Sequence, residues 1–166
     1  MTGKHRTSLA ALALALATSG AGFAHDEKAG ADKPRYDYAK APDTAFGKAF
    51  DPRRAKREVR VDMADTMRYS PAQVVVKRGE TVRFLVRNRG QQMHEMVLGT
   101  RKELEEHAAL MRKHPGMEHD EPHMVHVPPG KVGTMGWQFT KAGEFHYGCL
   151  IPGHWEAGMV GTIIVR

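Results

Sequence analysis

Hydrophobic and polar residues alternate along most of the chain after residue 56. A period of two is typical of β-strands with one buried face, and it is clearest at Val59, Val61 and Met63. The alternation, interrupted by Gly and Pro turns, predicts strands at 57–63, 69–76 (entered through a Pro turn), 82–87, 95–98, 132–139, 144–148 and 162–165. Short strands at this spacing indicate an all-β fold, an antiparallel β-sandwich with Greek-key connections.

One segment between these strands has helical periodicity instead. Residues 101–113 consist of strong helix formers, and Thr100 and Glu103 have the spacing of an N-terminal capping box. One face of this segment carries the apolar residues Leu104, Ala108 and Met111. Apolar residues at this spacing predict that one short helix, inserted between strands, packs against the sandwich.

The residues before the alternation predict an exported protein. A basic start, an apolar run at 9–17 and small residues up to Ala24 have the order of a secretory signal peptide. The run is too short to cross about 30 Å of hydrocarbon. We therefore expect residues 1–24 to be removed, with periplasmic localisation and no stable membrane insertion. Residues 25–56 have no clear period and predict a poorly ordered arm, which leaves 57–166 as the folded domain.

Composition and motifs narrow the function classes. The net charge is +6, with Asp and Glu interspersed and neither a basic helix nor an aromatic platform, so no nucleic-acid partner is expected. The sequence has no evident Gly-rich phosphate loop, Ser nucleophile motif or paired-carboxylate site, so no enzyme is expected. Cys149 is the single cysteine. It cannot form an internal disulfide, and in an oxidising compartment it must be buried, reactive or metal-bound.

The stretch 145–159 holds a candidate metal site. It contains Cys149, His154 and Met159 in the spacing Cys-x4-His-x4-Met. A thiolate, an imidazole and a thioether form a soft ligand set that suits copper changing between Cu(I) and Cu(II), and His94 is the best candidate for a second imidazole. Each residue alone is more often part of a core. With four protein ligands no position remains for a substrate, which favours carrying electrons or copper over catalysis.

This ligand spacing, in a loop before the last strand (160–166), resembles the type 1 copper site of the cupredoxins. The resemblance is closer to the small periplasmic cupredoxins of bacterial copper-tolerance systems. Two segments carry it, His-Glu-Met-Val-Leu-Gly-Thr at 94–100 and Tyr-Gly-Cys-Leu-Ile-Pro-Gly-His at 147–154. It covers roughly residues 57 to 166 and implies a cupredoxin-like sandwich that binds one copper.

The resemblance also implies a role for each ligand. His94, Cys149 and His154 would form a trigonal plane, with Met159 as a weak axial ligand. Many cupredoxins follow the first His with Asn, which holds the loops together and forms a hydrogen bond near the thiolate. Here Glu95 follows, so the reduction potential and colour of the site stay open.

A second group of soft ligands lies between the helix and the next strand. This His/Met-rich segment, 107–126, contains His107, Met111, His114, Met117, His119, His123, Met124 and His126. Imidazoles favour Cu(II) and thioethers Cu(I), so the segment predicts an accessory copper site. A polar excursion between strands is the alternative. His146, in contrast, is expected to be a surface residue and not a ligand.

Two functions remain open. In the first, the chain is a periplasmic type 1 copper protein that acts in copper tolerance by binding copper, with oxidation or onward transfer as further steps. In the second, it is a periplasmic electron carrier between redox partners. Both imply copper ions and a transient redox or copper-transfer protein as partners. Leu150, Ile151 and Trp155 are either an apolar rim for that partner or part of the core.

Overall fold

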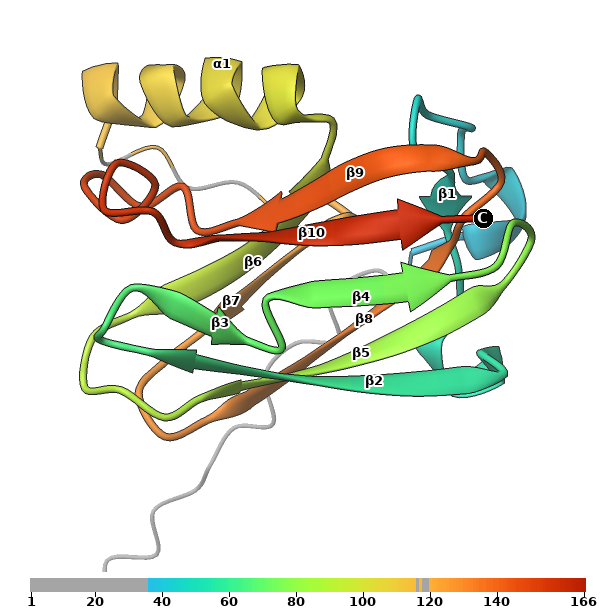
Figure 1. The fold of residues 1–166 in the computed structure, drawn as a ribbon, viewed down its shortest axis with the longest axis horizontal. Helices are drawn as coiled ribbons and strands as arrows, with labels where there is room; N and C mark the ends of the chain where they lie inside the picture. The colour runs from blue at the N-terminus through green and yellow to red at the C-terminus, as the bar shows by residue number, and fades with distance from the viewer. Residues whose placement is uncertain (1–35, 116, 118–119) are drawn as a thin grey trace, which may run out of the picture. The chain divides into compact units, whose positions relative to one another are not determined.

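The computed structural model describes residues 36–115, 117 and 120–166 (Figure 1). The strands are β1 (Lys48–Ala49), β2 (Arg57–Ala64), β3 (Arg68–Ser70), β4 (Gln73–Val76), β5 (Thr81–Asn88), β6 (His94–Gly99), β7 (Met124–Val127), β8 (Val132–Gln138), β9 (Gly143–Gly148) and β10 (Val160–Val165). The helices are α1 (Arg101–Lys113) and the short 3₁₀ turns η1 (Tyr38–Lys40) and η2 (Pro52–Arg54). The predicted signal peptide, the arm up to residue 35 and His119 lie outside the described residues.

The strands form two five-stranded sheets, ordered β1-β8-β5-β2-β3 and β4-β10-β9-β6-β7. The predicted β-sandwich is therefore confirmed, together with the single helix between strands. The expectation of purely antiparallel pairing is wrong for two pairs, because β2 runs parallel to β5 and β10 runs parallel to β4.

Residues 69–76 differ from the expected single strand. They form parts of β3 and β4, which belong to different sheets. Pro71 lies between the two strands, and it has no backbone N–H to donate to a ladder. The expected Pro turn is therefore the point at which the chain crosses from one sheet to the other.

The main core lies between the two sheets. Val61, Met63 and Phe84 point inward from the parallel pair β2 and β5 and are fully buried. The opposite sheet contributes Tyr147 and Ile163, which are equally buried. Removing these side chains from water is the main source of stability for a sandwich of this size.

Part of the predicted arm is ordered. Within residues 36–56, β1 pairs with β8, and Phe46 is only 4% exposed. The Phe46 ring stacks on Trp137 at 4.9 Å between centroids, and the Trp137 Nε1–H donates to the Phe46 carbonyl oxygen. A few isolated aromatic residues can anchor a segment without periodicity. The compact unit therefore begins at Tyr36, before the predicted boundary at residue 57.

Helix α1 packs on the outer face of the second sheet, over β6 and β9 (Figure 1). Thr100 and Glu103 form the predicted capping box. The buried side chains of the helix are Leu104, Ala108 and Met111, as predicted, and they join Val97, Met124 and Leu150 in a second apolar cluster. The helix therefore covers the strand that leads into Cys149.

His146 corrects a prediction. It lies in β9 and is 8% exposed, not a surface residue. Burial is the main cause that lowers the pKa of its imidazole, and the charge of Arg101 at the start of α1 acts in the same direction. The alternation placed His146 correctly on the face opposite Cys149, but α1 covers that face.

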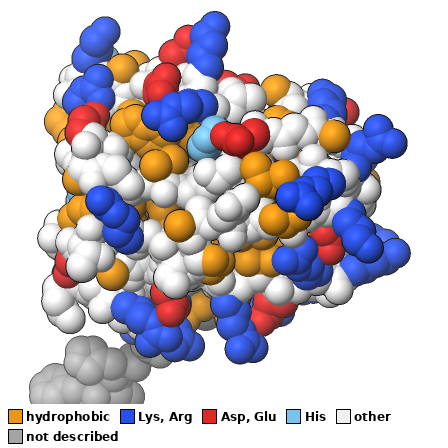
Figure 2. Space-filling model, in the orientation of Figure 1, with side chains coloured by type: hydrophobic (Ala, Val, Ile, Leu, Met, Phe, Trp, Pro, Cys, Tyr) orange, Lys and Arg blue, Asp and Glu red, His pale blue; other side chains and the backbone are white. Residues whose placement is uncertain are grey.

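The surface mixes charges of both signs. On the face shown in Figure 2, Lys and Arg side chains are interspersed with Asp and Glu. Arg89 pairs with Asp62 at 2.6 Å and Arg60 with Glu58 at 3.1 Å. Within the described part of the chain, no helix has the length and apolar character that crossing a membrane requires.

Candidate metal centre

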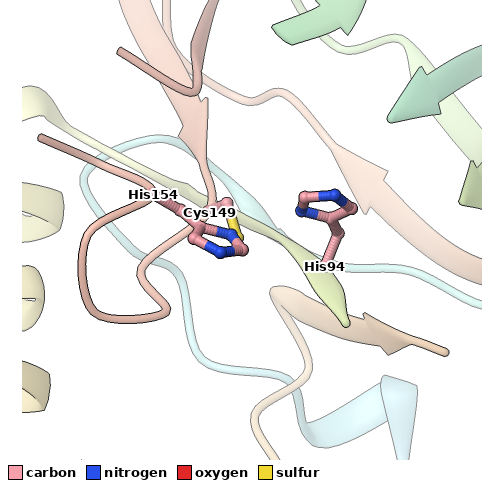
Figure 3. A group of neighbouring side chains, drawn as sticks. All are labelled: His94, Cys149 and His154. Carbon is pink, nitrogen blue, oxygen red and sulfur yellow. The ribbon is translucent and has the colours of Figure 1, made fainter. Parts of the chain in front are cut away.

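The structure brings His94, Cys149 and His154 together (Figure 3). Their ligand atoms all lie within 4.8 Å of one another, and all three residues are buried. Among the described residues, this is the one group of three or more His, Cys, Asp or Glu side chains gathered closely enough to hold a metal ion.

Sheet pairing explains how residues distant in sequence meet. His94 begins β6, and Cys149 directly follows β9. These strands are antiparallel neighbours, with Val97 opposite Gly148. The start of one strand therefore lies beside the end of the other. His154 comes from the loop between β9 and β10, and its ring centroid is 5.0 Å from that of His94.

The loop from Cys149 to Met159 closes on itself. The Cys149 N–H donates to the Met159 carbonyl oxygen at 3.2 Å, and the Met159 N–H donates to the His154 carbonyl oxygen at 3.0 Å. A further bond, from the His154 N–H to the Ile151 carbonyl oxygen at 2.9 Å, tightens the turn. Met159 is fully buried. The backbone thus holds the predicted axial ligand beside two other predicted ligands.

Burial controls the protonation of this centre. It raises the pKa of the Cys149 thiol to about 12, although the backbone N–H groups of Glu95 and Ile151 favour the thiolate. Burial also lowers the pKa of His154, and the neighbouring His94 lowers it further. His154 is therefore a neutral imidazole at neutral pH, ready to bind a metal. Cys149 keeps its proton until a cation replaces it.

Asp65 is a functional candidate that the sequence did not reveal. Its Oδ1 lies 3.0 Å from Nε2 of His94. The backbone N–H of Gln91 donates to the same carboxylate and is the main cause that lowers the pKa of Asp65. In the sequence, Asp65 is one acidic residue in a turn, 29 residues from His94. No spacing rule links such a residue to a ligand.

Glu95 holds the two halves of the site together. One carboxylate oxygen accepts from the Leu150 N–H at 2.8 Å, and the other lies 2.8 Å from Nε2 of His126. The Glu95 carbonyl oxygen accepts from the buried Tyr69 hydroxyl at 2.6 Å. Glu95 is 2% exposed. Glu95 therefore connects β6, β7 and the ligand loop. It occupies the position after the first His, where the resemblance implied Asn in many cupredoxins.

The donor set fits copper. Nδ1 of His94 is buried without a hydrogen-bond partner, as expected of a nitrogen that binds a metal. Sγ of Cys149 lies 3.2 Å from Nδ1 of His154, so the sulfur and a ring nitrogen point into the same space. Thiolate and imidazole donors, with Met159 on the same closed loop, suit copper better than the hard cations calcium or magnesium.

The His/Met-rich segment forms no comparable group among the residues described. Met111 and Met124 belong to the apolar cluster beneath α1, and His126 contacts Glu95. His123 packs edge-on against the ring of Phe46 at 6.0 Å between centroids. The remaining described members lie on α1 or just after it, His107 half-buried and His114 and Met117 exposed. His107, Met117 and His123 line one open pocket beside α1, whereas Met111, Met124 and His126 have other neighbours.

Of the two alternatives for Leu150, Ile151 and Trp155, an apolar rim or part of the core, packing against the core predominates. Leu150 is 1% exposed and lies in the cluster beneath α1. Trp155 packs against the same cluster, and the Arg101 guanidinium lies 5.9 Å from the centre of its ring. Ile151 packs against the main core and is partly exposed. Of the three residues, only the partly exposed Ile151 and Trp155 remain accessible to a partner.

Comparison with known proteins agrees with this geometry. Residues 55–166 match the family described as copper binding proteins of the plastocyanin/azurin family. The chain is 53% identical over 129 residues to the copper-resistant cuproprotein CopI of Rubrivivax gelatinosus, covering 78% of each chain. It is 35% identical over 151 residues to the protein of the same name from Pseudomonas aeruginosa, covering 74% of this chain and 83% of that one.

A solved structure gives the same result for the fold. Reduced auracyanin from the photosynthetic bacterium Roseiflexus castenholzii superposes with a TM-score of 0.58 at 18% identity, covering 68% of this chain and 98% of that one. At this identity the likeness establishes the fold alone. The match over residues 55–166 and the two CopI relatives establish more: this chain belongs to the plastocyanin/azurin family of copper binding proteins.

Proposed function

We propose that this protein acts in copper resistance in the periplasm, by binding copper through His94, Cys149 and His154 with Met159 as axial ligand. The observation that carries the proposal is the buried group of two imidazoles and one thiol, whose ligand atoms lie within 4.8 Å of one another. The name of the 53% identical relative, a copper-resistant cuproprotein, supports resistance as the setting.

The chain's own residues perform three tasks at this centre. Cys149 gives up its proton when a cation binds, since burial otherwise keeps the thiol neutral. His154 supplies a neutral imidazole, because burial lowers its pKa. The loop, closed by backbone bonds between Cys149, His154 and Met159, holds the donors in one arrangement. Bound copper would supply the change between Cu(I) and Cu(II).

The proposed role is binding, not catalysis. Four protein donors leave no open position for a substrate, unlike a catalytic metal site. A transient protein partner would take from the centre either one electron, which would leave Cu(II), or the copper ion itself. The partly exposed Ile151 marks the face where such a partner would meet the ligand loop. The exposed members of the His/Met-rich segment, His114 and Met117, are proposed to capture additional copper weakly.

A growth experiment tests the proposal. Cells lacking the gene are complemented with the wild-type protein, Cys149→Ser or Met93→Leu, and growth is followed as copper increases. Met93→Leu is the control because Met93 precedes His94 and is 43% exposed. Wild type and Met93→Leu should restore growth at high copper, and Cys149→Ser should not. If the deletion strain grows at high copper as well as the parent strain does, and has a respiratory defect at low copper, the proposal is contradicted and an electron carrier is favoured.

A further inference from the structure

We propose that Asp65 is a positioning residue for the metal centre: its carboxylate fixes the tautomer of His94 and stabilises Cu(II) relative to Cu(I) at the bound copper. The inference rests on the proposed copper binding at His94, Cys149 and His154. It adds a residue from a different part of the chain, the turn between β2 and β3, and assigns it an effect on the reduction potential.

The two nitrogens of the His94 ring have different surroundings. Nε2 lies 3.0 Å from Oδ1 of Asp65, whereas the buried Nδ1 has no hydrogen-bond partner. An ionised carboxylate only accepts hydrogen bonds, so Nε2 must carry the proton in this contact. The lone pair of the neutral ring is then on Nδ1. Asp65 thus selects the tautomer in which the unpartnered nitrogen is the metal donor.

Asp65 is itself held in place. The N–H of Gln91 donates to Oδ2 at 2.7 Å, and the N–H of Gln92 donates to Oδ1 at 3.3 Å. The loop approaches the carboxylate closely at Gly90, where an added Cβ would lie only 1.9 Å from Oδ1. The segment just before His94 therefore wraps around the carboxylate and fixes the acceptor relative to the ring.

A fixed anion at Nε2 has an electronic consequence. It makes the imidazole a stronger donor at Nδ1, and a stronger donor favours the more highly charged Cu(II) over Cu(I). The reduction potential should therefore be lower with Asp65 than without its charge. A merely structural Asp65, which only holds the turn at Gln91 and Gln92, would change stability and leave the potential of correctly folded protein unchanged.

Asp65→Asn keeps an acceptor oxygen for His94, loses the charge and removes the acceptor of the Gln91 N–H. The potential of the folded variant separates the two roles, because loss of the turn contact alone would leave it unchanged. Asp62→Asn is the matched control. Asp62 lies in β2, three residues before Asp65, and its carboxylate accepts from Arg89 at 2.6 Å and not from a predicted copper ligand. In purified full-length protein loaded with copper, Asp65→Asn should weaken Cu(II) binding by about 10-fold to 100-fold. A tenfold loss for Cu(II) alone corresponds to a rise of about 59 mV in midpoint potential.

The outcomes are distinct. A higher potential for Asp65→Asn than for Asp62→Asn, with the visible band retained, supports the inference. Equal potentials in the two folded variants overturn it. If the wild-type protein shows no thiolate-to-copper band, the proposed function fails instead.

A second measurement needs neither a variant nor copper. In metal-free wild-type protein, long-range ¹H–¹⁵N NMR spectra report which nitrogen of His94 carries the proton. The proton is expected on Nε2, and a spectrum that places it on Nδ1 overturns the inference. This result decides the role of Asp65 even if Asp65→Asn does not fold.

Discussion

The ligand centre and the His/Met-rich segment both contain His and Met side chains and differ in how the fold uses them. At the centre, His94 and Cys149 come from neighbouring strands, and their donors are buried within 4.8 Å of each other and of His154. In the segment, Met111 and Met124 enter an apolar cluster, while His107, Met117 and His123 line an open pocket in which Met117 is 38% exposed.

The difference teaches that proximity in sequence is a poor guide to a metal site. Three supports make the centre: a sheet register, a loop closed by backbone bonds, and the carboxylates of Asp65 and Glu95. A preformed site binds tightly because its donors are already ordered before the ion arrives. Exposed ligands on a helix end must be ordered by the ion itself, so their binding should be weaker.

The largest effect is expected from Cys149→Ser. Copper-loaded wild-type protein should show an intense visible band from charge transfer between thiolate and copper, and the variant should lose it because the donor is absent. His94→Ala should perturb the band heavily, and Met159→Leu should mainly change the potential and the band ratio. The measurement is an optical spectrum. Met117→Ser, in the His/Met-rich segment, is the control and should leave the band intact, whereas an intense band in Cys149→Ser would refute the site assignment.

The next effect concerns Glu95 and His126, where the two regions meet. Glu95→Ala leaves the buried Leu150 N–H without its acceptor, and an unsatisfied buried donor costs about 1–3 kcal/mol. His126→Ala should cost less, about 0.5–1.5 kcal/mol. The His126 side chain is 36% exposed, so water can replace it as a hydrogen-bond partner of the Glu95 carboxylate. Denaturant unfolding of metal-free protein measures both.

Glu58→Ala is the control for this pair, since Glu58 is an exposed carboxylate on β2 that pairs with Arg60. A change within about 0.5 kcal/mol is expected there. A similarly small change for Glu95→Ala would show that the link between the ligand loop and β7 contributes little.

At mildly alkaline pH a smaller effect is expected through the Cys149 thiol. Its pKa is about 12 in the folded protein against a usual 9.0. The unfolded chain therefore loses this proton first, and the folded chain binds more protons between these values. The free energy of unfolding of metal-free protein should fall as pH rises above 9.0. Unfolding curves of wild type and Cys149→Ser measure this: the variant should lack that part of the decline, and identical pH dependence would contradict it.

The parts of the fold and of the site that could be predicted are those set by residues close together in the sequence. Local patterns were sufficient for β2, β5 and α1, because alternation and capping involve neighbours in the chain. The spacing from Cys149 to Met159 also lies within one loop, and these residues do lie beside one another. His94 was chosen because the ligand set needed a second imidazole, and it does lie beside Cys149 and His154, although no local spacing links it to them.

Long-range contacts could not be predicted in the same way. Asp65 and Glu95 act through hydrogen bonds to His94 and Leu150, which lie 29 and 55 positions away in the sequence. Phe46 orders part of the arm by stacking on Trp137, 91 residues later. The change from one sheet to the other at Pro71 depends on the distant strands with which β3 and β4 pair. Each of these contacts is set by tertiary packing, which leaves no period in the chain.

The smallest effect is expected from the exposed end of the His/Met-rich segment. If His107, His114 and Met117 capture copper, the wild-type protein should bind more than one ion per chain under mild copper excess. Replacing all three with Ala should reduce that number to one and leave the visible spectrum unchanged, because none of them contacts the buried centre. Equilibrium dialysis with metal analysis gives the stoichiometry. Lys102, Glu105 and Lys113, exposed on α1, provide a matched triple-Ala control that should keep the wild-type number. A wild-type ratio of one would show that the fold uses these soft ligands for packing and solvent contact alone, and that capture belongs entirely to the preformed centre.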